Sequence, residues 1–390
     1  MKRIYMDNAA TTRVTPPVLE AMMPCLTGVY GNPSGIHSFG REARRMLEAA
    51  RAQVAAAVNA RPEEIYFTSG GTEADNWAVR GAAYARGGKG GHVITTAVEH
   101  HAVLNACRQL EREGFRVTCV PVDGEGVVRL DELEKAIGPD TALISVMTAN
   151  NEIGTIQPVE EIGRIARAHG VCFHTDAVQA IGAIPVDVQA SGADLMSLSG
   201  HKFHAPKGIG ALYIRSGVRL EPLMRGGAQE RAQRPGTENL ASAVGMGRAI
   251  ELAATGIADR AEKVAALRDR LMRGILEIPE CRVNGSLSRR LPGNLNVSVR
   301  YVEGESLLLN LDLQGVAASS GAACTSGSPE LSHVLLAIGL PRELAQGALR
   351  LSLNEENTEE EVDCVIAAMR GIVRRLRSMS PLAPEELKCF

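Results

Sequence analysis

The stretch LMSLSGHKFHAPKG, residues 195–208, decides the fold class. A strand-like apolar run ends in small polar residues, and His201 and Lys202 follow before a Pro-Lys-Gly turn. Lysine is rarely buried unless it is paired. Lys202 is therefore either an exposed loop residue or a reactive amine in a dry pocket, of the kind that forms a Schiff base.

Around this stretch, short apolar segments alternate with helical ones. Helices are expected at 39–59, 101–113 and 158–170, and strands within 65–68, 92–99, 142–150, 171–177 and 194–199. Such apolar strands, separated by helices, predict an α/β fold with a mostly parallel sheet covered on both faces. Residues 211–215 add an edge or an antiparallel strand.

The chain of 390 residues is longer than a single core usually supports, which predicts two domains. From about residue 257 the pattern changes to α+β. We place a large domain at 14–257 and a small α+β domain at 1–13 and 258–390.

Composition excludes several classes of protein. The net charge of −3 gives no reason to expect a nucleic-acid or membrane partner. No apolar run approaches the ~18 residues of a membrane span, and the first residues lack a signal-peptide pattern, so we expect a cytoplasmic protein. The eight cysteines form no C-x-x-C pair and no zinc-finger spacing, so most should be free thiols.

Polar clusters follow five of the expected strands, at 69–73, 99–101, 150–152, 176–179 and 199–202. In doubly wound sheets, ligands bind beyond the carboxyl ends of the strands. The five clusters are therefore expected to form one pocket.

Each cluster taken alone has two interpretations. Gly71 and Thr72 either cradle a phosphate at a helix N-terminus, or Thr72 only caps that helix. Asp176 either caps a helix or holds a pyridinium nitrogen protonated. His100 and His101 are structural donors or proton shuttles. Together, Lys202, Asp176 and the cradle are the parts that a pyridoxal phosphate (PLP) site needs.

The order of motifs resembles the NifS/IscS-like cysteine desulfurases over nearly the whole chain. The motifs are DNAATT (7–12), GNPSGIHSFGREAR (31–44), FTSGGTEADN (67–76), EHHAVL (99–104), ANNEIGTIQP (149–158), FHTDAVQA (173–180), SLSGHKFHAPKGIGALY (197–213), PGTEN (235–239), SSGAACTSG (319–327) and ALRLSLNEENTEEEVD (348–363). The resemblance implies a homodimeric fold-type I PLP enzyme with a large, mostly parallel sheet of the seven-stranded type. It also implies a reaction that converts L-cysteine to alanine and an enzyme-bound persulfide.

The resemblance assigns the cofactor-binding residues position by position. Lys202 matches the Schiff-base lysine, and Asp176 matches the partner of the pyridine nitrogen. Gln179 matches the donor to the ring hydroxyl, and His100 matches the histidine stacked on the ring. The phosphate ligands match Gly71, Thr72, Ser199, His201 and, from the neighbouring subunit, Thr237.

On the substrate side, Asn151 and Arg350 match the residues that hold the substrate carboxylate, a task that suits the planar fork of arginine. Asn151 is also expected to contact the cofactor. Cys324 matches the catalytic cysteine and lies among small residues, as a mobile loop would. Cys324 would pass its sulfur to an iron–sulfur scaffold protein or another acceptor such as the tRNA thiolation machinery, and is a candidate transient iron–sulfur ligand.

Some positions depart from the family pattern: His204-Ala205, Arg225, Ala228 and Pro235. None of them removes a catalytic group. Three rival functions stay open, namely an aminotransferase, a selenocysteine lyase and a non-catalytic sulfur-relay subunit.

Overall fold

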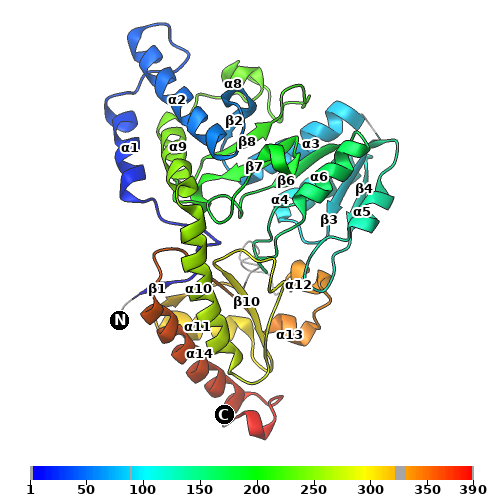
Figure 1. Ribbon diagram of the computed structural model, residues 1–390, viewed down its shortest axis with the longest axis vertical. Helices are drawn as coiled ribbons and strands as arrows, with labels where there is room; N and C mark the ends of the chain where they lie inside the picture. Colours follow the sequence, from blue (N-terminus) through cyan, green and yellow to red (C-terminus); the bar gives the residue numbers. More distant parts are fainter. Residues whose placement is uncertain (1–2, 88–89, 321–330, 389–390) are drawn as a thin grey trace.

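The computed structural model describes residues 3–87, 90–320 and 331–388, so Cys324 lies outside the described residues. Its centre is a seven-stranded sheet in the order β2-β8-β7-β6-β5-β3-β4 (Figure 1). The strands are β2 (Ile65–Thr68), β3 (His92–Thr96), β4 (Arg116–Val120), β5 (Thr141–Ser145), β6 (Cys172–Asp176), β7 (Leu195–Ser199) and β8 (Gly210–Ile214). The predicted α/β class with a mostly parallel sheet is confirmed.

Strand β8 is the one strand of this sheet that runs against the others, and it pairs with both β2 and β7. It is antiparallel and interior, so the expectation of an edge strand is wrong for residues 211–215. Gly210 at its start is opposite both Thr68 and Ser199. A Cβ there would lie 2.6 Å from the Leu198 carbonyl oxygen and 2.7 Å from the Gly70 backbone, so only glycine lets the two neighbouring strand ends pack this closely.

Helices cover both faces of the sheet because its strands are apolar on both sides. Leu195 and Met196 are neighbours on β7, yet Leu195 belongs to the apolar cluster that contains Trp77 of α3, and Met196 belongs to the cluster that contains Leu47 of α2. The helices of this half are α1 (Pro16–Thr27), α2 (Ser38–Ala57), α3 (Gly71–Ala82), α4 (His101–Arg112), α5 (Leu130–Ala136), α6 (Val159–Ala168), α7 (Val188–Ser191), α8 (Gln229–Ala232) and α9 (Leu240–Ala254). The sequence patterns did not predict α1, β4 or α9.

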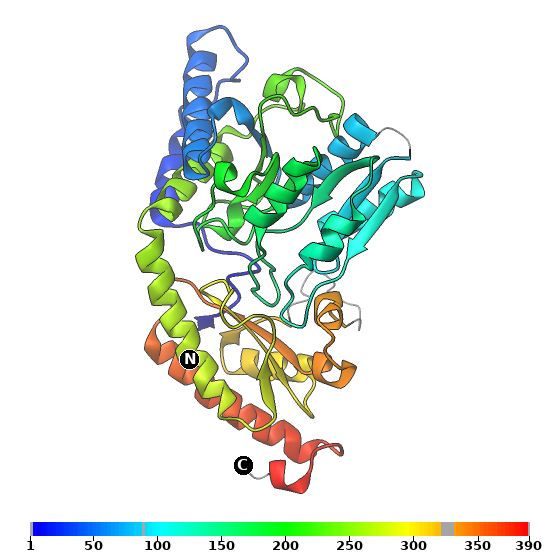
Figure 2. The ribbon, with the colours of Figure 1, turned by 45° about the vertical axis from the view of Figure 1, so that its right-hand side comes forward.

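The second half of the molecule has its own apolar cluster around an antiparallel sheet in the order β12-β10-β9 (Figure 2). The N-terminal strand pairs in parallel with β11 of this half. Its elements are β1 (Ile4–Tyr5), α10 (Ile257–Leu276), β9 (Cys281–Val283), β10 (Asn294–Val299), α11 (Gly304–Leu313), β11 (Val316–Ala317), α12 (His333–Ala337), α13 (Arg342–Gln346), β12 (Ala348–Ser352) and α14 (Glu359–Met379). The domain boundaries stay a prediction.

Helices α9 and α10 meet at Gly256, which has a φ of +62° and breaks the helical path between the two sheets. Within the described ranges, no helix combines the length and apolar composition needed to cross a bilayer.

Candidate active site

Lys202 lies at the end of a short 3₁₀ turn (Gly200–Lys202) that follows β7. Its Nζ atom donates to the carbonyl oxygens of Ala9 at 2.6 Å and Ala10 at 2.9 Å. The Nε2 atom of Gln179 donates to the same Ala9 oxygen at 2.9 Å. Lys202 is partly buried and its amine is held by carbonyls, so it is not an exposed loop lysine.

Asp176 is the last residue of β6 and is 6% exposed. Its Oδ1 atom accepts a hydrogen bond from the Val178 amide at 2.9 Å, which makes a local turn. The residues after Asp176 form turns rather than a helix, so the helix-cap interpretation is wrong. Burial raises the pKa of Asp176 to about 6, while the Val178 amide and the charge of Lys202 act in the opposite direction.

The predicted phosphate cradle is formed where β2 leads into α3. A Cβ on Gly71 would lie 2.8 Å from Val178 Cγ2 and 3.3 Å from Ser199 Cβ, so three strand-end segments converge here. The N-cap of α3 is Gly70, and no side chain caps this helix, so Thr72 is not a helix cap. Thr72 is exposed in the first turn of α3, where backbone N–H groups favour an anion.

His201 joins the N-terminal segment to the end of β7. Its Nδ1 atom lies 3.1 Å from Thr11 Oγ1, and its carbonyl oxygen accepts from the amide and the hydroxyl of Thr12, each at 2.9 Å. Burial, and then the charges of Lys202 and Lys207, lowers the pKa of His201 to about 4.

His100 is the N-cap of α4, and its Nδ1 atom accepts from the Ala102 amide at 3.1 Å. This bond leaves the proton of the neutral ring on Nε2. Burial, and then the charge of Lys202, lowers the pKa of His100 to about 4, so the ring is neutral at physiological pH. The His101 ring lies instead against His333, with the ring centroids 4.8 Å apart.

Arg350 lies on β12 and is 2% exposed. Its Nη1 atom donates to the Asn151 carbonyl oxygen at 3.0 Å, and its Nη2 atom donates to Asp7 Oδ1 at 2.9 Å. Its Nε atom is buried and has no hydrogen-bond partner in the described part of the chain. The Arg350 backbone also pairs with Ser319, which leads into the segment 321–330 that contains Cys324.

Thr237 is exposed in the loop between α8 and α9. Arg234 in this loop binds Glu73 of α3 at 2.8 Å, which holds the loop near the cradle. The structure does not bring Thr237 into contact with the other predicted phosphate ligands of the described chain.

Sequence reasoning missed several groups around these residues. The carbonyls of Ala9 and Ala10 belong to the quoted motif DNAATT, but a sequence motif does not show which backbone atoms face a lysine. A buried polar layer lies behind Asp176. Its sequence signal was the run of three polar residues His174-Thr175-Asp176 at the end of an otherwise apolar strand. The layer comprises Asp75, Glu99, Ser145, His174 and Ser197.

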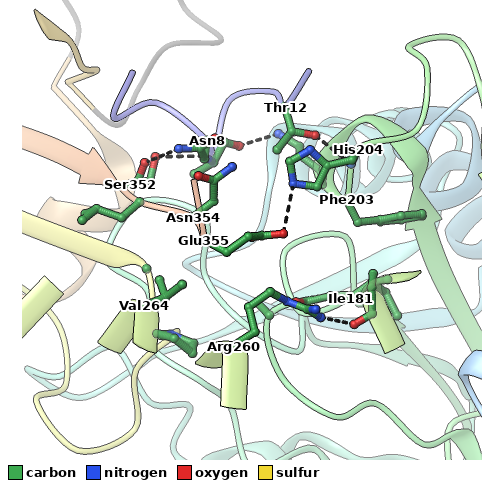
Figure 3. Close-up of a pocket in the computed structure, with 18 of the residues that line it drawn as sticks. Asn8, Thr12, Ile181, Phe203, His204, Arg260, Val264, Ser352, Asn354 and Glu355 are labelled. Atoms are coloured by element: carbon green, nitrogen blue, oxygen red, sulfur yellow. Dashed lines mark hydrogen bonds and ion pairs between the residues drawn. The ribbon is translucent and has the colours of Figure 1, made fainter. Parts of the chain in front are cut away.

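A cavity of about 400 Å³ lies on the other side of the N-terminal segment (Figure 3). Lys202, Gln179 and Asn8 line it, whereas Asp176 and His100 do not. Its remaining walls come from α9, α10 and the turn after β12, and it is largely apolar. Lys202 and Gln179 therefore border this cavity, whereas Asp176 and His100 do not line it.

Comparison with known proteins agrees with this geometry. The family described as "Aminotransferase class-V" matches residues 4–365. The chain belongs to the class-V aminotransferase family. It is 54% identical over 387 residues to "Cysteine desulfurase IscS" of Methanosarcina thermophila, covering 99% of this chain and 96% of that protein. It is 52% identical over 390 residues to the protein of the same name from Clostridium botulinum, covering 99% and 98%.

Solved structures give the same result. A "NIFS-LIKE PROTEIN" superposes with a TM-score of 0.90 at 42% identity, covering 95% of this chain and 99% of that one. A structure described as "SspA in complex with cysteine" has a TM-score of 0.81 at 36% identity, covering 91% and 99%. The predicted NifS/IscS-like resemblance and the fold-type I architecture are confirmed.

Proposed function

We propose that this chain is a PLP-dependent cysteine desulfurase that removes sulfur from L-cysteine and leaves L-alanine. The observation that carries the proposal is the position of the Lys202 amine. Its charge acts on both Asp176 and His100, two buried groups from different strand ends. A lysine whose charge acts on a buried carboxylate and on a neutral histidine is a combination that PLP chemistry uses.

The residues present fit the cofactor. The close approach of Gly71 to Val178 and Ser199 brings Ser199 to the α3 N-terminus, which no side chain caps, and Thr72 and His201 would complete the phosphate site there. Lys202 would be the covalent attachment point, Asp176 would face the pyridine nitrogen and Gln179 the ring hydroxyl. When bound, PLP supplies an electron sink for the charge left by removal of the α-proton.

Arg350 and Asn151 would hold the substrate carboxylate. The Nε atom of Arg350, which has no partner among residues 3–87, 90–320 and 331–388, is one hydrogen-bond donor that a carboxylate can take up. Its bond to Asp7 fixes the guanidinium plane before substrate arrives, which reduces the cost of ordering it on binding.

Two groups would move protons. The Lys202 amine would take the α-proton of the bound substrate. His100 would exchange its ring proton at Nε2, because Nδ1 accepts from the Ala102 amide.

Cys324 would be the nucleophile. Its thiolate attacks the substrate sulfur, an S–S bond forms as the substrate C–S bond breaks, and the carbon keeps the electron pair and gains a proton to give alanine. The persulfide on Cys324 then passes to an iron–sulfur scaffold protein or another acceptor.

The deciding experiment measures alanine and sulfide from L-cysteine with a thiol reductant, for wild type and Cys324→Ala. We expect equal amounts of both from wild type and neither from the variant, which keeps the cofactor's yellow absorbance. The matched control is Cys364→Ala, an exposed cysteine on α14, and it should behave as wild type.

Other outcomes favour the rivals. Undiminished sulfide from Cys324→Ala means that another thiol or direct elimination does the work. Amino transfer that is insensitive to Cys324 indicates an aminotransferase, and faster turnover of selenocysteine indicates a lyase. A colourless protein that binds no PLP points to a relay subunit.

We also propose a cytoplasmic homodimer in which Thr237 reaches the phosphate of the partner subunit. Exposed apolar side chains gather on α1 and the segment after it, where Leu19 is 50%, Leu26 59% and Tyr30 72% exposed. A surface of this kind favours a second protein copy. Light scattering of wild type and Leu26→Glu tests it: a dimer that the charge weakens supports the proposal, and a monomeric wild type contradicts it.

A further inference from the structure

A second carboxyl group lies buried behind Asp176. Asp75 projects from α3 and is 1% exposed. Its Oδ1 atom has no hydrogen-bond partner among the described residues, and it lies 3.7 Å from His174 Nε2. A buried ionised carboxylate with an unsatisfied oxygen is costly unless a cation compensates it.

His174 does not supply that cation. It is fully buried, with Nδ1 2.8 Å from Ser145 Oγ and Nε2 3.0 Å from Ser197 Oγ. Burial lowers the pKa of His174 to about 3, so the ring is neutral. The imidazole serves as a neutral link between two hydroxyl groups.

The other titratable groups that face Asp75 are acids. Asp176 comes from β6, and Glu99 precedes α4 and accepts from the Thr96 hydroxyl at 2.7 Å. Of the carboxyl groups named here, Asp176 is the one whose pKa the charge of Lys202 lowers. One nearby ammonium cannot compensate several buried carboxylates, because like charges at this depth repel strongly.

We propose that Asp75 is held as a neutral carboxylic acid, which keeps Asp176 the carboxylate of the pair and makes Asp75 a positioning residue for it. Burial, and then the charge of Asp176, raises the pKa of Asp75 well above its usual range, while the Ser197 hydroxyl acts in the opposite direction, and the net rise agrees with this arrangement. The two carboxyl groups thus have opposite protonation states set by their surroundings.

The functional consequence rests on the proposed role of Asp176 opposite the pyridine nitrogen. A second negative charge behind Asp176 would make its ionisation harder and would weaken the coupling of Asp176 to the pyridine nitrogen. The neutral acid avoids that charge and offers one O–H donor within the Ser197–His174–Ser145 layer.

Infrared spectroscopy of the cofactor-free full chain at neutral pH tests the protonation state directly. We expect a band from a buried protonated carboxyl group that Asp75→Asn removes. Glu99 is a second buried carboxyl group, and burial raises its pKa to about 8. Glu99→Gln is therefore the matched control, and it should leave the Asp75 band in place. A spectrum unchanged by Asp75→Asn overturns the proposal.

The holoenzyme tests the positioning role through the pH titration of cofactor absorbance. Asn mimics a neutral acid, so Asp75→Asn should leave the midpoint in place and change kcat by less than about tenfold, whereas Asp75→Ala should shift the midpoint. A midpoint that moves equally in both variants means that Asp75 is charged.

If Cys324→Ala still makes sulfide, the desulfurase mechanism fails while the infrared result stands. If the Asp75 variants do not fold, Glu99→Gln decides: a protonated-carboxyl band that persists in it at neutral pH supports the proposal, and the absence of any such band overturns it.

Discussion

The cofactor side and the substrate side of the pocket are assembled in different ways. Asp176, Ser199 and Gly71 lie at adjoining ends of one sheet, so strand pairing alone sets their spacing. Arg350 instead depends on Asp7, which lies 343 positions away in the sequence and belongs to the N-terminal segment. The seven-stranded sheet therefore places the cofactor side, to which the N-terminal segment adds contacts with Lys202, whereas the substrate side requires the two chain ends to pack together.

The Ala9 carbonyl is where the two sides meet. It accepts from Lys202 and from Gln179, while the amide of Ala9 donates to the Ser352 hydroxyl on β12 at 2.9 Å. One residue of the N-terminal segment thus fixes the reactive lysine and also contacts the strand that carries Arg350. Variants that affect one side alone can test this separation.

Lys202→Ala should have the largest effect because it removes both the attachment point and the base. We expect kcat to fall by about 10⁴-fold, the upper range for a general base, together with loss of the covalent cofactor absorbance. Steady-state kinetics and absorbance spectra measure both. Lys207→Ala changes an exposed lysine five residues later and should leave both readouts unchanged. Normal turnover by Lys202→Ala would remove the basis of the proposed chemistry.

Asp176→Asn should damage the cofactor side only. Removing one partner of a buried charge pair costs about 3–5 kcal/mol, which corresponds to a loss of about 10²- to 5 × 10³-fold in kcat. Because Arg350 and Asp7 are untouched, KM for L-cysteine should change little. Asp194→Asn, on the loop before β7, is the control. A rise in KM as large as the fall in kcat would show that the two sides are not separable.

Arg350→Lys should damage the substrate side only. The lysine loses the planar fork that holds Asp7 and the substrate carboxylate together, and such charged bonds contribute about 1.5–3 kcal/mol each. We expect KM to rise by about 10- to 100-fold while the affinity for PLP is kept. Titration with PLP and kinetics with L-cysteine separate the two effects. Arg342→Lys, at an exposed position, is the control, and an equal loss of PLP affinity in Arg350→Lys would contradict the comparison.

The same contrast explains what the sequence could and could not predict. Short apolar segments that alternate with helical segments predicted the sheet. The polar clusters at the strand ends placed Lys202 and Asp176 at neighbouring strand ends. These are local signals, because each residue follows its own strand. No local signal showed that β8 lies inside the sheet, because an apolar segment does not reveal which strands will pair with it.

The substrate side and the buried layer depended on contacts that no local pattern encodes. The Asp7–Arg350 bond joins the two ends of the chain. Asp75 sits among apolar helix positions, and only its packing on β6 and β7 shows that it lies behind Asp176. The roles of Cys324 and Thr237 remain predictions from the family resemblance.

The smallest expected effect concerns stability, and it again separates the two sides. The acid on the substrate side, Asp7, is paired with Arg350. The Glu99 carboxyl group beneath the cofactor side accepts, within the described chain, from the neutral Thr96 hydroxyl and Met147 amide. Burial raises the pKa of Glu99 to about 8, far above its unfolded value of about 4.3. The folded chain therefore holds an extra proton between these values, and its stability falls as pH rises through that window.

Glu99→Gln should remove this dependence, which amounts to at most about 1.4 kcal/mol per pH unit for one proton. The urea midpoint of the cofactor-free chain, measured upward from about pH 6.5, isolates it, because buried histidines of low pKa change stability only below the unfolded histidine value. We expect the stability of Glu99→Gln to rise relative to that of wild type as pH approaches about 8. The control Glu111→Gln, at an exposed position on α4, should follow wild type. Parallel curves for Glu99→Gln and wild type would mean that Glu99 is already ionised in the fold. The cofactor side would then hold a buried negative charge, as the substrate side does in the Asp7–Arg350 pair. The two sides would differ only in how the chain assembles them.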